Sequence, residues 1–395
     1  MGKLTQYWSI SWTFIKARFL RLDKLLLLLC IVASGFSVYL LYTMRRNGIN
    51  PDVITSRTWK VQMAAAMAGL TIALGISLIN YKFISRLWFI YAPAAIALSL
   101  LLFTPLAGSS TTGSDELNWI DLGVVQIQPS EFLTVAFIMT FATHLQALQR
   151  SGKLNHLPQV LLLCLHAVVP TGIMVAQGNM GAPMIVLLVF LVMIFMAGIS
   201  WKYIAAAVAT APVLGWLFWN YFAKEYHKLR ILVIFDETLQ QQEIRRYFHQ
   251  QSRSLMAMSS GGLSGQGLEG GEYISIFAMH NDFIFSYIGM TLGLIGCILV
   301  LLLLLAICIK LLAVMGAAKD SLGRSICAGA FALVFFNTVI NVGMAIVVTP
   351  VVGVPLPLIS AGGSSTLSLY IALGLVLSVW AHRKKEYRMF YTETE

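Results

Sequence analysis

The sequence predicts an all-α polytopic membrane protein with about ten transmembrane helices. Of its 395 residues, 58% are hydrophobic and only 11% are charged, and the mean hydropathy is +0.78. A soluble domain of this composition would lack the polar surface needed to cover its own core. Apolar blocks of about 18–25 residues recur, which is the length that crosses a hydrocarbon core of about 30 Å. A β-barrel would instead show short segments of alternating polarity.

Ten such blocks are present, and charge placement orients them. The expected helices are residues 24–43, 59–80, 87–106, 129–148, 158–176, 182–199, 203–219, 283–309, 325–349 and 364–381. An even number puts both termini on one side, and Lys and Arg gather in the segments of that side. Apart from the long segment 220–281, the other side keeps only Arg45, Arg46, Arg57 and Lys60. We therefore predict cytoplasmic termini and an extracytoplasmic loop 220–281 between helices seven and eight.

The flanking segments and the cysteines add little chemistry. Residues 1–23 mix aromatic and basic residues, as in a cytoplasmic or interfacial helix, and no cleavage site follows. Residues 24–381 are expected to form one transmembrane domain and residues 382–395 a cytoplasmic tail. The net charge of +10 indicates contact with anionic lipid rather than nucleic-acid binding. The five cysteines lie in or beside apolar helices without paired spacing, which predicts neither a disulfide nor a zinc site.

The second outer loop begins as a flexible linker by composition, at residues 108–113. It ends in Gln128-Pro129-Ser130-Glu131, where Pro129 suits the first helical position and Glu131 suits the positive end of the helix dipole. Glu131 belongs either to this helix start or to a polar site on the outer face.

Polar residues between helices five and six, in residues 177–183, must line protein or water because lipid cannot satisfy their backbone groups. For Gln177 and Asn179, interhelical hydrogen bonding is favoured over substrate contact.

The long outer segment has three parts. Residues 226–237 are mixed in character, residues 240–253 have the periodicity of a surface helix, and residues 259–271 are rich in glycine. The last part is not a P-loop, because it lacks the Gly-Lys-Ser ending and a preceding strand. By composition it is a flexible loop.

Asp282 ends this segment. No further charge occurs from Phe283 to Ile309, so its carboxylate is expected where a helix meets water. It is either a helix-start residue or a catalytic group.

The last outer segment breaks the helical pattern. Residues 350–365 contain three prolines and three glycines, and Asn337 and Asn341 precede them on one helix face. Such a break should be buried against other helices or line a water-filled groove.

Together these motifs resemble the SEDS family of RodA, FtsW and SpoVE. The resemblance rests on Gln128-Pro129-Ser130-Glu131, on Ser260-Gly261-Gly262, on Asn281-Asp282-Phe283-Ile284-Phe285, on Asn341-Val342-Gly343-Met344, and on Gly353-Val-Pro355-Leu-Pro357-Leu-Ile-Ser360-Ala-Gly362-Gly363-Ser364. The motifs occur in the family's order over almost the whole chain, and the last leans toward the RodA branch.

The resemblance implies a peptidoglycan glycosyltransferase that polymerises lipid II at the outer face of the bacterial plasma membrane, for cell elongation or division. It implies a class B penicillin-binding protein as partner, an inverting reaction, and Asp282 as general base. Arg230 best matches the family among the basic candidates for the leaving pyrophosphate, the others being Lys228, Arg245, Arg246 and Arg253. A divalent cation, Mg or Mn, could share this role, although the residues predict no metal site. The expected substrate-binding residues are Arg230, Lys228, Glu131, Gln128, Ser130, Ser260, Gly261, Gly262, Asn341, Pro355, Pro357, Ser360, Gly362, Gly363 and Ser364.

Some positions depart from the family pattern. Thr134 stands where a Lys is common, Asn179 where an Asp is usual, and Met290 and Thr291 where acids are usual. These changes motivate a second hypothesis, a catalytically silent scaffold. The broken helices and intramembrane polar residues motivate a third, a flippase for the lipid-linked precursor, although no ionisable relay runs through the helices. Retention of Asp282 and Glu131 favours the enzyme.

Overall fold

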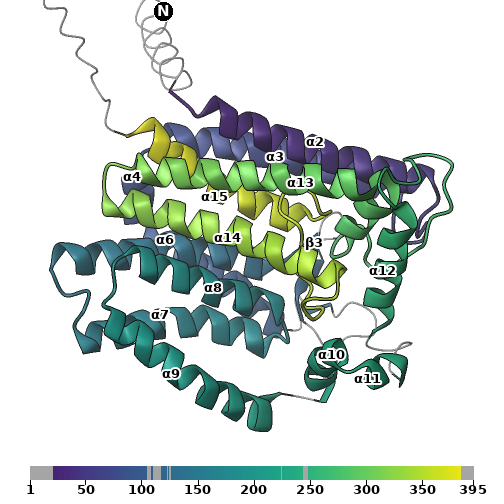
Figure 1. Cartoon of the computed structure of the whole chain (residues 1–395). Coiled ribbons are helices and arrows are strands. Elements are labelled where there is room, and N and C mark those ends of the chain that lie inside the picture. Colours follow the sequence, from purple (N-terminus) through teal and green to yellow (C-terminus); the bar gives the residue numbers. More distant parts are fainter. Residues whose placement is uncertain are drawn as a thin grey trace, which may run out of the picture.

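The computed structural model describes residues 21–104, 108–109, 117–121, 123, 126–223, 225–242 and 248–383, and almost all of them are helical (Figure 1). Within these residues, eight helices are long and apolar enough to cross a membrane, and two shorter apolar helices accompany them. The longer ones are α2 (Lys24–Arg46), α3 (Ser56–Leu78), α6 (Pro129–Arg150), α7 (Leu157–Ala176), α9 (Trp201–Leu217) with its π-helical extension η2 (Phe218–Phe222), α13 (Ile284–Gly316), α14 (Ser321–Ala345) and α15 (Gly363–Ala381). The shorter ones are α5 (Trp88–Leu100), continued by η1 (Leu101–Phe103), and α8 (Gly181–Met196). The prediction of about ten membrane helices is confirmed.

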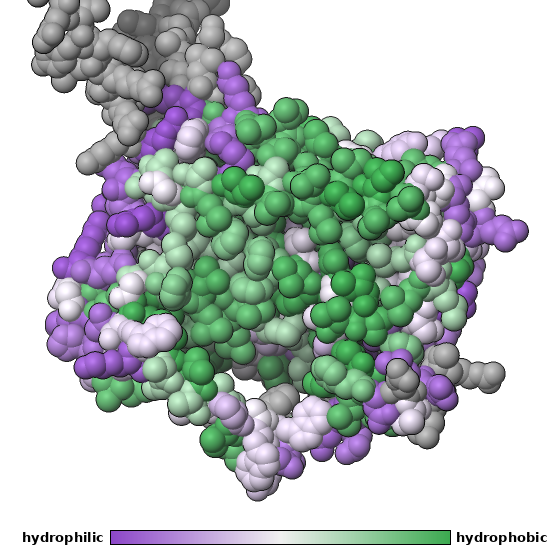
Figure 2. Space-filling model, viewed as in Figure 1, coloured by the Kyte–Doolittle hydropathy of each residue, from purple (hydrophilic) through white to green (hydrophobic). Residues whose placement is uncertain are grey.

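The bundle shows a broad apolar face with hydrophilic residues gathered at its two ends (Figure 2). At one end, called the site end here, α2 and α14 end and α3, α6, α13 and α15 begin. At the opposite end, Lys310 pairs with Asp23 at 2.7 Å and Lys82 pairs with Asp320 at 2.5 Å. The Lys310 pair explains why α13 continues to Gly316, past the predicted end at residue 309. The charge is neutralised by a buried carboxylate, so it does not end the helix.

The segment 220–281 is more ordered than its composition predicted. It contains α10 (Glu225–Phe235), α11 (Glu237–Gln242) and α12 (His249–Gly261). The predicted surface helix at residues 240–253 overlaps α11 and α12, and its middle, residues 243–247, lies outside the described residues. The buried residues Ser254 and Ala257 lie on α12, which packs against α13.

A small antiparallel sheet was not predicted. It joins β1 (Gly108–Ser109), β2 (Trp119–Asp121) and β3 (Gln126–Ile127), with Ile120 opposite both Gly108 and Ile127. The expected linker at residues 108–113 thus begins with a strand, and its remainder lies outside the described residues. A short helix, α4 (Tyr81–Arg86), completes the described elements.

Candidate functional site

The chain between α14 and α15, residues 346–362, lies at the site end and is called the irregular segment here. Val354, Leu356 and Ile359 are all buried, and the fully buried Asn341 of α14 donates a hydrogen bond to the carbonyl of Val354 at 2.8 Å. Irregular backbone at this depth needs partners inside the protein, because lipid offers none. The predicted burial of this break is confirmed.

Asp282 lies in a tight turn just before α13. The N–H groups of Asn281, Asp282 and Phe283 all donate to the carbonyl of Ala278, whose φ of +55° is in the left-handed region. Phe283 holds the N-cap position of α13. Asp282 therefore lies one residue before the N-cap of α13.

The half-buried Asp282 carboxylate faces the irregular segment. Its Oδ2 lies 3.8 Å from the point where a Cβ on Gly353 would stand, and its backbone carbonyl accepts a hydrogen bond from Asn341 at 2.9 Å. Gly353 has a φ of +70°, so a residue with a side chain there would be strained. The fold thus brings the starts of α13 and of the irregular segment together around this carboxylate.

Two adjoining cavities lie beside this point, between α6, α14, α15 and the irregular segment. Their polar and backbone-breaking lining residues are Gln128, Glu131, Thr134, Asn179, Asn337, Gly353, Pro355, Pro357, Ser360, Ser365 and Ser368. Gly353 belongs to this lining and also faces Asp282. A cavity with few, convergent polar groups next to a half-buried carboxylate is the best candidate for a functional site in the described residues.

Glu131 is the acid in this lining. It lies in the first turn of α6, which begins at Pro129 as predicted, and its Oε2 accepts a hydrogen bond from Ser368 at 3.2 Å. The carboxylate therefore belongs to the polar cavity as well as to the helix start. Ser368 was not predicted, although Ser364, Ser365 and Ser368 recur at helical spacing and so share one face of α15.

Asn337 also lines both cavities. Its Oδ1 is buried and has no hydrogen-bond partner among the described residues. A buried amide oxygen is costly without a partner, so this atom is suited to receive a donor from a molecule in the cavity.

Other predicted site residues hold the helix starts together. Ser364 accepts a hydrogen bond from the N–H of Gln128 at 3.0 Å, and the hydroxyl of Ser130 accepts one from Asn179 at 3.5 Å. Gly362 precedes α15 and Gly363 begins it. These contacts join α6, α8 and α15 around the cavity.

The basic candidates differ in their placement. Arg230 on α10 donates from Nη1 to the carbonyl of Val351 at 3.3 Å, so its guanidinium lies on the same irregular segment as Gly353. Lys228 pairs with Glu225 of its own helix at 3.7 Å. Arg245 and Arg246 lie outside the described residues. Arg230 is therefore a predicted cation that contacts the irregular segment directly.

Ser260, Gly261 and Gly262 do not line the cavities. They lie where the glycine-rich segment packs against a kink in α13 at Gly293, whose φ is +66°. The N–H groups of Gln266 and Gly267 donate to the carbonyls of Met290 and Thr291 at 3.0 Å each. Met290 and Thr291, the neutral residues at usually acidic positions, are fully buried in this contact. Acids there would need partners of their own, so neutral side chains suit the packing.

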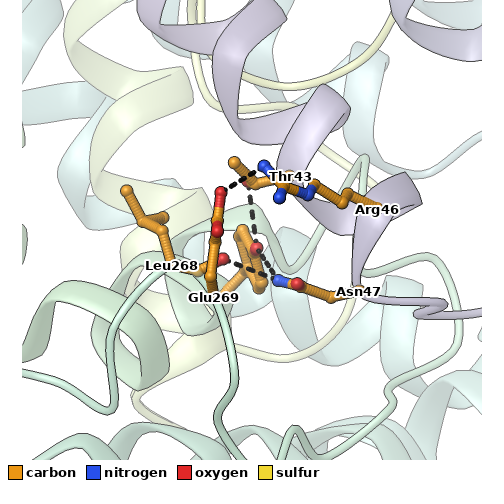
Figure 3. A network of polar contacts seen from close by, with 6 residues as sticks. Thr43, Arg46, Asn47, Leu268 and Glu269 are labelled. Atoms are coloured by element: carbon orange, nitrogen blue, oxygen red, sulfur yellow. Dashed lines mark hydrogen bonds and ion pairs between the residues drawn. The ribbon is translucent and has the colours of Figure 1, made fainter.

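A second network joins the glycine-rich segment to the end of α2 (Figure 3). Asn47 donates to the carbonyl of Leu268 at 2.8 Å, Arg46 pairs with Glu269 at 2.5 Å, and the hydroxyls of Thr43 and Tyr287 lie 3.1 Å apart. The ion pair is more than half exposed on both sides and contributes little. The two hydrogen bonds hold Leu268 and Tyr287, on either side of Asp282 in the sequence, against the end of α2.

Gln177 makes the interhelical hydrogen bond that was expected of it, from Nε2 to the carbonyl of Ser99 at 2.8 Å. Asn179 and Thr134 line the cavity and bond nearby groups, the N–H of Ala182 at 3.1 Å and the carbonyl of Ser130 at 2.8 Å. The polar groups of both neutral side chains therefore form hydrogen bonds with nearby residues of the chain.

His280 provides a pH-dependent test of this turn. Burial lowers its pKa from 6.5 to about 4. An unfolded chain binds this proton below pH 6.5 and the folded chain only near pH 4, so stability should fall as pH is lowered through that window. We expect the thermal midpoint in detergent to fall less between pH 7 and pH 4.5 in His280→Gln than in the unmodified chain. Identical pH dependence of the two proteins would contradict the buried neutral imidazole.

Side chains that could bind a metal are scattered over the described residues. No group of three or more His, Cys, Asp or Glu side chains comes together among them. The cation expected from the resemblance, Mg or Mn, stays a prediction, and the chemistry below is derived from the side chains alone.

Comparisons with known proteins agree with this architecture. A family model described as cell cycle protein, of FtsW, RodA and SpoVE, matches residues 21–385. The peptidoglycan glycosyltransferase MrdB of Escherichia coli K12 is 29% identical over 297 residues, covering 74% of this chain and 79% of that protein. The peptidoglycan glycosyltransferase RodA of Treponema pallidum is 25% identical over 437 aligned positions, covering 91% and 98%.

Two solved structures share the fold. A chain from a study of polymerisation and crosslinking by a peptidoglycan synthase complex has a TM-score of 0.73 at 23% identity, covering 91% of this chain and 97% of that one. The rod shape determining protein RodA of Thermus thermophilus has a TM-score of 0.65 at 22% identity, covering 92% and 98%. At these identities they support the fold alone.

Proposed function

The chain belongs to the family of the cell cycle proteins FtsW, RodA and SpoVE, and from this premise we propose that it is a peptidoglycan glycosyltransferase that polymerises lipid II. The observation that carries the proposal is the half-buried Asp282 carboxylate beside Gly353 and the polar cavity, at the end of the bundle that also carries Arg230. This end is the outer face of the bacterial plasma membrane in the topology inferred from Lys and Arg placement.

In the proposed reaction, a sugar hydroxyl of the acceptor attacks the anomeric carbon of the lipid-linked donor. Asp282 takes the hydroxyl proton as the new carbon–oxygen bond forms, a role that typically contributes about 10²–10⁴-fold in rate. The bond from the anomeric carbon to the pyrophosphate oxygen breaks, and the lipid pyrophosphate leaves with the electron pair. A single displacement of this kind inverts the configuration at the anomeric carbon.

The leaving pyrophosphate gains negative charge, which a positioned cation stabilises. Arg230 is the candidate, because its bond to Val351 holds the guanidinium over the segment that faces Asp282. The carboxylate lies at the start of a membrane helix, where a lipid-linked donor can keep its tail in the bilayer. A class B penicillin-binding protein is the proposed partner, supported by the fold shared with a chain of a peptidoglycan synthase complex.

The experiment is polymerisation by the purified full chain, alone and with its penicillin-binding partner, given lipid II in detergent. Glycan polymer longer than the disaccharide unit is the expected product. Translocation of lipid II across sealed liposomes without polymer would favour a flippase instead. Complementation of a deletion strain by Asp282→Asn, without polymer from either protein, would favour a scaffold.

A further inference from the structure

The turn that carries Asp282 receives three successive hydrogen bonds from other elements. The carbonyls of His280, Asn281 and Asp282 accept from the N–H of Ala361 at 2.8 Å, the hydroxyl of Ser360 at 2.5 Å and the amide of Asn341 at 2.9 Å, respectively. Two of these donors belong to adjacent residues of the irregular segment. The place of the Asp282 carboxylate therefore depends on where residues 360–361 are held.

One buried side chain, Gln62 of α3, contacts both ends of residues 360–362 and is 2% exposed. Its Nε2 lies 3.3 Å from the carbonyl of Ser360, and its Oε1 accepts the N–H of Gly362 at 3.0 Å. A backbone N–H can only donate and a carbonyl can only accept, so these partners fix the orientation of the amide. An amide is the side chain that meets both demands at once.

The same amide is anchored to the helices behind it. Its Nε2 also lies 3.1 Å from the hydroxyl of Thr366 on α15 and 3.3 Å from that of Ser37 on α2. Gln62 therefore joins three transmembrane helices to the segment that holds the Asp282 turn. No charged group takes part in this chain of contacts.

The backbone is strained on both sides of the contact between the Asp282 turn and residues 360–362, which explains why this contact needs support. Ala278 before the turn has a φ of +55°, and Leu358 before Ser360 has a φ of +62°. Residues with side chains in this region are strained and persist only where surrounding contacts determine them. Without the hydrogen bonds from residues 360 and 361, the turn would keep only the bond from Asn341 among those that it receives from other elements.

We propose that Gln62 is a positioning residue for the proposed glycosyltransferase reaction. It fixes residues 360–362, and through the carbonyls of His280 and Asn281 it fixes the Asp282 carboxylate against Gly353. The inference rests on the proposed function. It does not place Gln62 in contact with substrate.

The test variant is Gln62→Met, which keeps the side-chain volume and removes both hydrogen-bonding groups. A second variant, Gln62→Glu, keeps an acceptor for the N–H of Gly362. The matched control is Gln149→Met, because Gln149 donates to the carbonyl of Ala197 at 2.8 Å at the opposite end of the bundle. Since a displacement of about 1 Å can lower a rate by about 10²-fold, we expect kcat to fall about 10-fold or more in Gln62→Met. KM for lipid II should change less than kcat, because the inference places Gln62 itself outside the substrate contacts. Gln62→Glu should lose less, and Gln149→Met should match the unmodified chain.

Two further measurements separate positioning from general damage. In the Asp282→Asn background, Gln62→Met should cause no additional loss, because the group that it positions is already gone. The labelling experiment uses the Cys164→Ser background, which removes the exposed native thiol. A cysteine placed by Asp282→Cys should react with a water-soluble maleimide at a rate that Gln62→Met changes several-fold. The labelling rate of a cysteine placed by Ser259→Cys should stay the same when Gln62→Met is added. This labelling does not depend on activity, so it tests the inference even where no polymer forms. Unchanged kcat and labelling in folded Gln62→Met, or an equal loss in the Asp282→Asn background, would overturn it.

Discussion

Asp282→Asn is expected to lower the rate of glycan polymerisation by about 10²–10⁴-fold, the usual contribution of a positioned general base. Asparagine has the same shape but cannot take the hydroxyl proton. The turn should keep its form, because the hydrogen bonds to its carbonyls from Asn341, Ser360 and Ala361 do not use the Asp282 side chain. We therefore expect KM for lipid II and the thermal midpoint to change little.

The control for this prediction is Asp236→Asn. Asp236 also lies in the segment 220–281, and its carboxylate caps α11 by accepting from the N–H groups of Thr238 and Leu239. Asparagine caps helices about as well as aspartate. The control should polymerise lipid II at the unmodified rate, which shows that loss of an outer carboxylate is not itself harmful.

Gly265→Ala in the glycine-rich segment is expected to lower stability through two separate effects. A Cβ at Gly265 would overlap the carbonyl of Thr291 in the kinked part of α13. Backbone atoms of two packed elements cannot move apart cheaply, and such overpacking costs typically about 1–3 kcal/mol. The left-handed φ of +80° adds about 1–2 kcal/mol for a residue with a side chain.

Gly270→Ala separates these two effects. Gly270 has almost the same φ, +78°, but a Cβ there meets no atom within 4 Å. Its substitution should carry the backbone strain without the overlap. Thermal unfolding in detergent should therefore show a clearly lower midpoint for Gly265→Ala than for Gly270→Ala. Equal midpoints would show that the glycine-rich segment does not pack on the kink.

The helices could be predicted from the sequence because the membrane imposes their length and composition. Their ends were less predictable where a charge has a distant partner. Lys310 seemed to end a helix, yet Asp23 neutralises it from the other end of the chain. The glycine-rich segment seemed flexible because its composition does not reveal the carbonyls of Met290 and Thr291 on which it packs.

The candidate site was predictable in part for the same reason. Asp282, Glu131 and the irregular segment belong to local motifs, and the resemblance assigned them roles. The partners of these residues are far away in the sequence. Ser368 bonds Glu131 across 237 residues, and Gln62 reaches Ser360 across 298. Neither pairing has a local signal, because only the packing of α3 and α15 brings those side chains to the site.

The role of Asp282 as general base is tested by measuring lipid II consumption and glycan chain length in one reaction. The reaction is run with purified unmodified protein and with Asp282→Asn at equal folded concentration. We expect long glycan chains and steady consumption of lipid II from the unmodified protein, and almost none from Asp282→Asn. Equal chain length and rate from the two proteins would contradict Asp282 as the general base.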